Sequence, residues 1–163
     1  FPFQLFGVGH GTKDMVEWTM AHRTNVNAFD HKCWTQDQIH WAYAGNAREA
    51  QEGLIKRFSH ASTQCRFPLY GVRQPDSAPD FDHFGSGSTA LQRMLVQEVG
   101  EKIHLLPAWP ADWDADFKLH LRNQTVLNGK VVKGELVHWT IFPEVRKTDV
   151  VIYLPQKNKH KVP

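Results

Sequence analysis

Cysteine is scarce in this chain, and long apolar runs and a strong charge bias are missing; each of these features excludes a class of protein. Cys33 and Cys65 are too few for a disulfide scaffold, and the sequence leaves open whether they pair or stay free. No run of about 20 apolar residues occurs, so no transmembrane helix is expected. The formal net charge is +2, and only residues 157–161 concentrate positive charge. We interpret that tail as solvated and expect neither a nucleic-acid nor a membrane partner.

Motifs for metals, cofactors and activated nucleophiles are also missing. The ten histidines form no H-E-x-x-H pair and neither cysteine has a second one nearby, so we expect no metal site and no cofactor. The glycine-rich run 7–11 lacks the Rossmann spacing and is interpreted as a turn. Ser86 and Ser88 lack the spacing of a G-x-S-x-G elbow. No signal peptide is recognised, and the apolar start without Met suggests a cut within a longer protein.

Aromatic residues are what the chain has in excess. Apolar residues make up 41% and charged residues 22%, which is typical of a folded globular protein. Six Trp and ten Phe raise the aromatic share to 12%. Most of them are expected in a core, but the excess is also compatible with carbohydrate binding, because aromatic faces stack on the C–H faces of sugar rings.

Apolar residues at steps of three and four predict helices in the first two thirds. One helix is expected over 13–22, with Met15 on its apolar face. A second is expected over 36–60, beginning at a capping box in 35–38 and broken near Gly45. Each helix has an apolar face that needs partners.

A long loop is expected between the second and third helices. It covers 61–87 and ends in a glycine-rich turn at 85–87. The third helix is expected over 89–99, with Leu91 facing inward and Gly100 as its stop. The loop is long enough to suggest a functional role.

Alternation of apolar and polar residues replaces the helical period after Gly100. It predicts strands over 103–106, 117–121, 135–142 and 150–154. Asn128-Gly129, between two apolar triplets, predicts a two-residue hairpin turn. Val137, Trp139 and Ile141 are expected on one face of their strand.

The change of period predicts an α+β chain with two units. We place a helical domain at 1–101 and a β-domain at 102–163. Three helices with long loops do not close a core by themselves. The chain is therefore expected to be a fragment of a larger protein.

The stretch 76–87 is the best candidate for chemistry. Asp80 and Asp82 stand two residues apart in front of a glycine-rich run, and such carboxylates can serve as general acid or base. On spacing alone, the favoured interpretation is that these aspartates are solvated turn residues or charges that cap a helix. A calcium loop is a third interpretation, although the EF-hand pattern is absent. Trp109 is a candidate for lining a sugar site or for packing at the domain boundary.

Two stretches carry a family resemblance. Residues 82–97 end in Met-Leu-Val-Gln, and 101–110 contain Ile-His-Leu-Leu-Pro-Ala; residues 41–50 supply a third, weaker match. Together they resemble the C-terminal region of glycoside hydrolase family 95 and its bacterial relatives, over roughly 33–141 of this chain. Counting back from Gln97 without gaps, Asp82 falls on the aspartate of the family's Ile-Asp-Gly-Asn-Phe-Gly-Gly loop. This chain has His-Phe-Gly-Ser-Gly after that aspartate.

The resemblance implies a fold and a reaction. The fold would be the terminal helices of an (α/α)6 toroid followed by a small antiparallel β-sandwich. The reaction would be inverting hydrolysis of an α-linked L-fucose-like or L-galactose-like sugar, with Asp82 as the base. The general acid and two asparagines would lie upstream of Phe1. Asp80 or His83 would orient Asp82 and contact the substrate.

Two function hypotheses follow. In the first, the chain belongs to a secreted or periplasmic glycoside hydrolase, and its partners are the carbohydrate substrate and the rest of the parent enzyme. In the second, it is a non-catalytic carbohydrate-binding or structural module, with Trp109, Trp113 or Trp139 as stacking platforms. The position of the Asp82 carboxylate, facing a cleft or facing bulk solvent, would discriminate between them.

Overall fold

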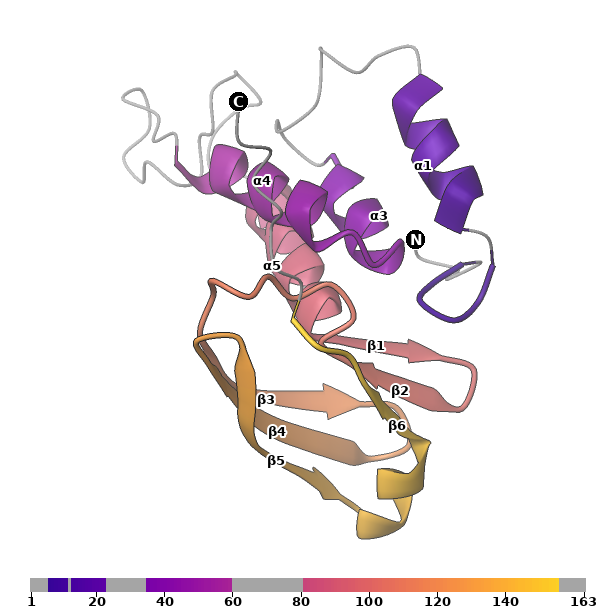
Figure 1. Ribbon diagram of the computed structural model, residues 1–163, viewed down its shortest axis with the longest axis vertical. Helices are drawn as coiled ribbons and strands as arrows, with labels where there is room; N and C mark the ends of the chain where they lie inside the picture. The colour runs from indigo at the N-terminus through magenta and orange to yellow at the C-terminus, as the bar shows by residue number, and fades with distance from the viewer. Residues whose placement is uncertain (1–5, 12, 23–34, 60–80, 156–163) are drawn as a thin grey trace.

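The computed structural model describes residues 6–11, 13–22, 35–59 and 81–155, and for 81–83 it describes the backbone. The helices lie at one end of the molecule and the strands at the other (Figure 1). Their order along the chain is α1 (Lys13–His22), α3 (Asp37–Tyr43), α4 (Ala47–Phe58), α5 (Phe81–Leu95), β1 (Val96–Val99), β2 (Lys102–Leu105), β3 (Ala115–Leu121), β4 (Thr125–Val132), β5 (Glu135–Phe142), the 3-10 helix η2 (Glu144–Asp149) and β6 (Val150–Ile152). The α+β class, with helices first and strands after, is confirmed.

The first three helices agree with the sequence period. α1 has the predicted bounds, but Met15 is 64% exposed and so does not face inward as predicted. The second predicted helix is two, α3 and α4, with the break at Gly45, whose φ is +72°. The predicted capping box is wrong: α3 is preceded by Gln36, which makes no side-chain cap bond. The effective cap belongs to α4, where the Asn46 side chain accepts a hydrogen bond from the Glu49 amide at 3.2 Å.

α5 differs most from its prediction. It begins at Phe81 and ends at Leu95, so the glycine-rich turn expected at 85–87 is helical and 96–99 is a strand. Leu91 is 39% exposed, not inward-facing. Tertiary packing overrides local propensity here. A Cβ at position 87 would overlap the ring of Phe58, which shows that the aromatic ring occupies the space left by glycine.

The two helical glycines of α5 should therefore respond in opposite ways to alanine. A Cβ at Gly85 meets no atom within 4 Å, so Gly85→Ala should raise the free energy of unfolding by about 0.5–1 kcal/mol through helix propensity. Gly87→Ala should lower it by about 1–3 kcal/mol, because the Phe58 ring must move. Urea denaturation of both variants checks the pair. Equal effects at the two positions would contradict the close packing of α4 against α5.

The strands form two three-stranded sheets. In the first, of order β1-β2-β6, β1 and β2 are antiparallel while β2 and β6 are parallel. The second, of order β3-β4-β5, is antiparallel throughout. The expectation of purely antiparallel pairing is therefore wrong for the β2–β6 pair, which closes after the long excursion through β3, β4 and β5.

The hairpin turn predicted at Asn128-Gly129 is wrong. Both residues lie inside β4, where Gly129 pairs with Phe117 of β3 on one side and Trp139 of β5 on the other. A Cβ at Gly129 would overlap the Phe117 ring, so the glycine makes room for an aromatic side chain of the neighbouring strand. The chain turns instead before β4 and after it, at Asn123-Gln124 and Lys133-Gly134, where all four residues have positive φ.

A register shift in β5 changes which of its residues face the core. The β4–β5 pairing shifts between Lys130 and Val131, so that Val131 lies opposite Leu136 and Lys130 opposite His138. Val137 is left 62% exposed, while Ile141 is 9% exposed. The prediction that Val137 shares a face with Ile141 is therefore wrong, because an alternating pattern is interrupted by one extra residue.

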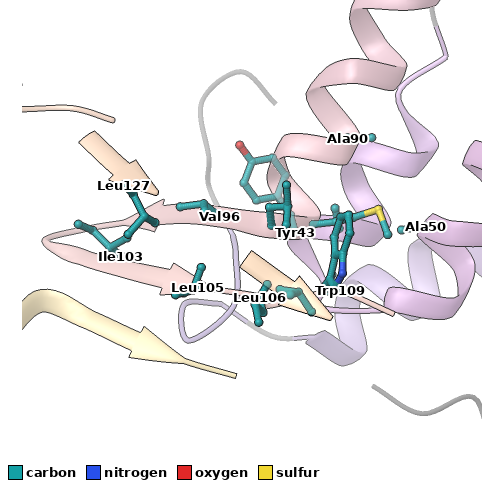
Figure 2. Close-up of a cluster of buried hydrophobic side chains, with 14 of the residues drawn as sticks. Tyr43, Ala50, Ala90, Val96, Ile103, Leu105, Leu106, Trp109 and Leu127 are labelled. Atoms are coloured by element: carbon teal, nitrogen blue, oxygen red, sulfur yellow. The ribbon is translucent and has the colours of Figure 1, made fainter. Parts of the chain in front are cut away.

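One buried cluster joins the helices to both sheets, and Figure 2 shows it. It includes Ile39 and Tyr43 of α3, Ala50 of α4, Ala90 and Met94 of α5, Ile103 and Leu105 of β2, and Leu127 of β4. The expected boundary at 101/102 falls in the turn between β1 and β2, which pair as a hairpin across Val99 and Lys102. The division into two domains remains a prediction.

Candidate functional site

The sequence-predicted site residues lie in two places. Asp80 is outside the described residues. Asp82 and His83 belong to the first turn of α5, so Asp82 does not precede the helix on a loop as expected. Trp109 lies far along the chain in the segment after β2 and is 3% exposed. The structure thus places position 82 at a helix N-terminus, where the helix dipole favours an ionised carboxylate.

Arg57 is the most deeply buried charged side chain near the start of α5. It stands in the last turn of α4 and is 0% exposed. Its Nη1 donates to Ser86 Oγ at 2.9 Å, and its Nη2 donates to Thr35 O at 2.7 Å and to Gln38 Oε1 at 3.2 Å. One guanidinium therefore ties three segments together: the residue leading into α3, α3 itself and α5.

The hydrogen bond from Arg57 to Ser86 holds the first turns of α5, which include position 82. Ser86 follows Asp82 by four residues in the same helix, and residues at that spacing lie on one face. A buried guanidinium bonded to Ser86 thus lies on the side of α5 to which position 82 belongs. The N-terminus of the helix itself suits a carboxylate in the first turn.

The second predicted place, around Trp109, is a packing site. The Trp109 indole N–H donates to the Trp113 carbonyl at 2.9 Å, and the two rings meet edge-on at 5.6 Å between centroids. The segment that contains Trp109 also bonds to the end of α5: the Leu106 amide donates to Leu95 O at 2.7 Å. With its ring 3% exposed, Trp109 presents no face to a ligand in this structure, which supports its packing role over its sugar-lining role.

A cavity of about 230 Å³ borders the glycine-rich run 7–11, which is a turn as expected. Gly7 and His10 exchange two backbone hydrogen bonds of 2.9 Å. The buried Gln97 holds this turn in place: its Oε1 accepts from the Val8 amide at 3.3 Å, and its Nε2 donates to Ala42 O at 2.6 Å. The Gln that ends the Met-Leu-Val-Gln motif is thus a structural residue that links β1, α3 and the turn.

The buried His104 and the partly buried Tyr153 form a polar pair beside the same turn. His104 Nδ1 lies 3.0 Å from Tyr153 Oη, and His104 is 6% exposed. Burial lowers the pKa of His104 and raises the pKa of Tyr153. Both shifts favour the neutral forms, so the hydrogen bond joins an uncharged imidazole to an uncharged phenol.

The His104 shift predicts a pH-dependent stability. Because its pKa is lower in the folded than in the unfolded chain, unfolding takes up a proton when the pH falls below about 6.5, the ordinary histidine value. The contribution of neutral His104 is complete above that pH and diminishes toward the folded pKa. The difference in unfolding free energy between wild type and His104→Gln should therefore shrink from pH 7 to pH 5, measured by urea denaturation. A constant difference would contradict the assignment.

The described residues contain neither a candidate metal centre nor a membrane-spanning helix. Within 6–11, 13–22, 35–59 and 81–155, no group of three or more His, Cys, Asp or Glu side chains is placed to hold a metal ion. In the same ranges no helix has the length and apolar character needed to cross a membrane. Cys33 and Cys65, whose pairing the sequence leaves open, both lie outside the described residues.

Comparison with protein-family models, curated proteins and solved structures finds no match for this chain. Sequence reasoning missed Arg57, Gln97 and His104 as organising residues. Arg57 had a weak signal, a cation at a position between apolar helix residues, but its partners are 19 to 29 residues away in the chain.

Proposed function

We propose that this chain is the C-terminal part of an inverting glycoside hydrolase that acts on an α-linked L-fucose-like or L-galactose-like sugar. Its helices are the last of an (α/α)6 toroid, and its sheets form the β-sandwich that follows. Asp82 is the general base, and Asp80 or His83 orients it. The carbohydrate substrate and the rest of the parent enzyme are its partners, in an extracellular or periplasmic setting.

The observation that carries the proposal is the position of residue 82 in the first turn of α5. The N-terminus of α5 favours negative charge in its first turn, and the Arg57–Ser86 hydrogen bond of 2.9 Å holds the start of this helix in place. A general base must stay ionised until it takes a proton from water, and positive surroundings favour the ionised form. Arg57 is a positioning residue here, because it holds α5 against α3 and α4.

Inverting hydrolysis needs two carboxyl groups with room for a water between them, at roughly 6.5–9.5 Å. By resemblance, the acid is a glutamate upstream of Phe1. The exposed side chains of Met15 and Trp18 on α1, at 64% and 63%, support a further protein surface in contact with this helix. The rest of the parent enzyme is the partner we propose for it.

The isolated 163-residue chain should therefore show no enzymatic turnover. An assay with aryl α-L-fucosides and aryl α-L-galactosides is the measurement, and the full-length enzyme is the positive control. Removing one of two cooperating groups usually costs about 10²–10⁴-fold in rate. Turnover by the isolated chain that disappears in Asp82→Ala would show that the acid lies within these residues, and would contradict the upstream assignment.

The three tryptophans named for the module hypothesis do not favour it. Trp109 is buried, Trp113 packs edge-on against it, and Trp139 has the Lys147 ammonium 5.8 Å from its ring centroid. A stacking platform needs an open aromatic face. The discriminating feature named above, the direction of the Asp82 carboxylate, falls on a side chain outside the described atoms.

A further inference from the structure

The turn between β3 and β4 carries a sequence motif that the proposed hydrolysis does not use. Asn123-Gln124-Thr125 is the chain's one Asn-x-Ser/Thr triplet. In proteins that pass through a secretory pathway, this triplet is the acceptor for an N-linked glycan when the middle residue is not proline. Because the glycan is bulky and hydrophilic, the asparagine has to lie on the surface of the folded protein.

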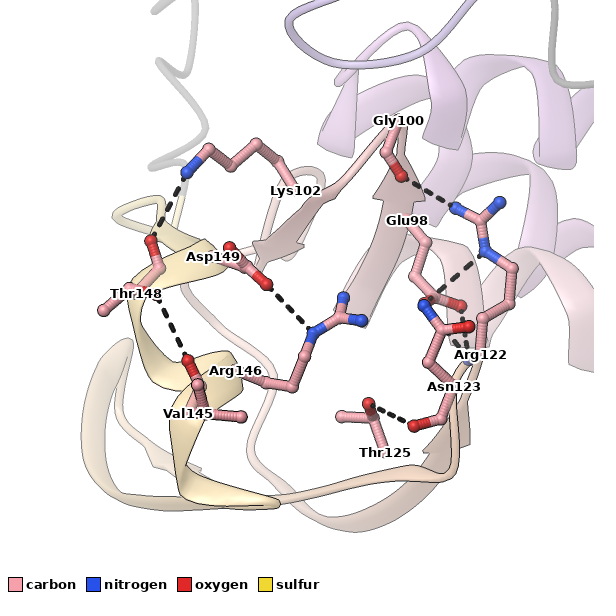
Figure 3. A network of polar contacts seen from close by, with 10 residues as sticks. All are labelled: Glu98, Gly100, Lys102, Arg122, Asn123, Thr125, Val145, Arg146, Thr148 and Asp149. Atoms are coloured by element: carbon pink, nitrogen blue, oxygen red, sulfur yellow. Dashed lines mark hydrogen bonds and ion pairs between the residues drawn. The ribbon is translucent and has the colours of Figure 1, made fainter.

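Asn123 meets this condition, as its side chain is exposed on the turn (Figure 3). Its φ of +57° is in the left-handed region, which asparagine tolerates better than most residues. Within the described part of the chain, the Asn123 side-chain amide makes no hydrogen bond. The neighbouring Arg122 anchors the turn instead, because its backbone amide donates to both carboxylate oxygens of Glu98 at 3.1 Å. A glycan on Asn123 therefore displaces no contact of the turn.

Thr125, the third residue of the triplet, has a hydroxyl that the fold does not require. Its side chain is 0% exposed and lies on the same face of β4 as the apolar Leu127 and Val131. Among the described residues the hydroxyl makes one hydrogen bond, to the Asn123 carbonyl at 3.4 Å, which is beyond the usual range of about 2.5–3.0 Å. A buried hydroxyl with so weak a partner costs free energy, and valine has the same shape without the hydroxyl.

We propose that Asn123 is an N-glycosylation site and that the glycan is attached before the β3–β4 turn folds. The hydroxyl of the third residue is part of the signal that the transferase recognises, and in the folded chain the side chain of Thr125 is inaccessible. The order of events explains why this hydroxyl is present and yet buried. The proposal rests on the extracellular setting proposed above, but it requires neither Asp82 nor hydrolysis.

The reaction is a group transfer from an oligosaccharide activated as a lipid pyrophosphate. The Asn123 Nδ2 forms a bond to C1 of the first sugar, while the bond from C1 to the phosphate oxygen breaks. The lipid pyrophosphate leaves with the electron pair of that bond, and one amide proton is released. Nothing is oxidised or reduced, and the amide carbonyl is unchanged.

The glycan would leave the proposed catalytic region uncovered. From position 82 to Leu95 the axis of α5 is about 20 Å long, at 1.5 Å per residue. The β3–β4 turn is tied to the strand beyond that far end, since Arg122 also donates to the Gly100 carbonyl at 3.2 Å. Loss of hydrolysis and loss of the glycan are therefore separate outcomes.

The full-length protein, secreted from eukaryotic cells behind a secretion leader, tests the proposal. Mass spectrometry of the tryptic peptide 123–130, before and after treatment with peptide N-glycosidase, should find a glycan on Asn123 and none on Asn128. Asn123→Gln and Thr125→Val should each abolish the glycan. Asn128→Gln is the matched control, because Asn128 lies in β4 with lysine two residues on, and this variant should keep the glycan.

A second measurement tests the order of events. The unglycosylated protein, made in bacteria and folded, is incubated with microsomal membranes and compared with the same chain translated in their presence. The folded protein should remain unmodified at Asn123, and the nascent chain should gain the glycan.

Three results would overturn the proposal. The first is a secreted, folded protein with no glycan on Asn123, and the second is a glycan that persists in Thr125→Val. The third, equal modification of the folded and the nascent chain, would contradict attachment before folding. Because attachment precedes folding, a variant that fails to fold is scored on the chain retained inside the cell.

Discussion

Under the proposed function, replacing Asp82 with asparagine in the full-length protein should lower kcat by about 10²–10⁴-fold while substrate affinity changes little. Asparagine keeps the size and shape of the side chain but cannot take a proton from water. The loss therefore falls on the transition state and not on ground-state binding. Steady-state kinetics gives kcat, and calorimetry on the inactive variant gives the affinity for substrate.

A matched control separates the base from a general effect of charge. Asp116 of β3 pairs with Lys130 at 3.8 Å and its side chain is 80% exposed, so Asp116→Asn should leave kcat within about twofold, as expected for an exposed surface pair. Near-normal turnover in Asp82→Asn would show that Asp82 is only a helix-start residue. Asp80 would then be the next candidate for the base.

The second large effect concerns folding. Arg57→Leu should lower the free energy of unfolding by about 3–5 kcal/mol, because it removes the donor on which several buried acceptors depend. The Thr35 carbonyl, Gln38 Oε1 and Ser86 Oγ each lose a hydrogen bond of 2.7–3.2 Å. Since domains are typically stable by about 5–15 kcal/mol, a large share of the total would be lost. Urea denaturation followed by circular dichroism measures it.

Two further variants serve as controls for the Arg57 prediction. Arg48→Leu on the same helix removes an exposed ion pair with Glu52 and should leave the unfolding midpoint nearly unchanged. Arg57→Lys keeps the charge but lacks the planar fork, so its loss should be intermediate. If Arg57→Leu were as stable as wild type, the three-way connection between α3, α4 and α5 would not contribute to folding.

Periodicity along the chain determined the broad organisation by itself. Steps of three and four placed α1 at its bounds, Gly45 marked the break between α3 and α4, and alternation placed β5 and most of β3. These predictions succeed because each depends on which face of one element is apolar, and that information is contained in neighbouring residues. The change from helices to strands near Gly100 is of the same kind.

The tertiary structure decided where glycine interrupts the chain and where it does not. Gly87 and Gly129 are turn signals when only their neighbours are considered, yet one lies within α5 and the other within β4. In each case an aromatic ring from another element, Phe58 or Phe117, occupies the space that a side chain would need. Such a partner is invisible to a local pattern.

The candidate site depends on the tertiary structure for the same reason. The sequence singled out Asp82 and the glycine-rich run after it. Only the folded chain shows that position 82 lies in a helical turn and that Arg57 bonds to Ser86 in the same helix. Arg57 and Ser86 are 29 residues apart in the chain. Hydrogen bonds between distant segments form because burial leaves a charged group no water to bind, and that requirement arises only once the chain is folded.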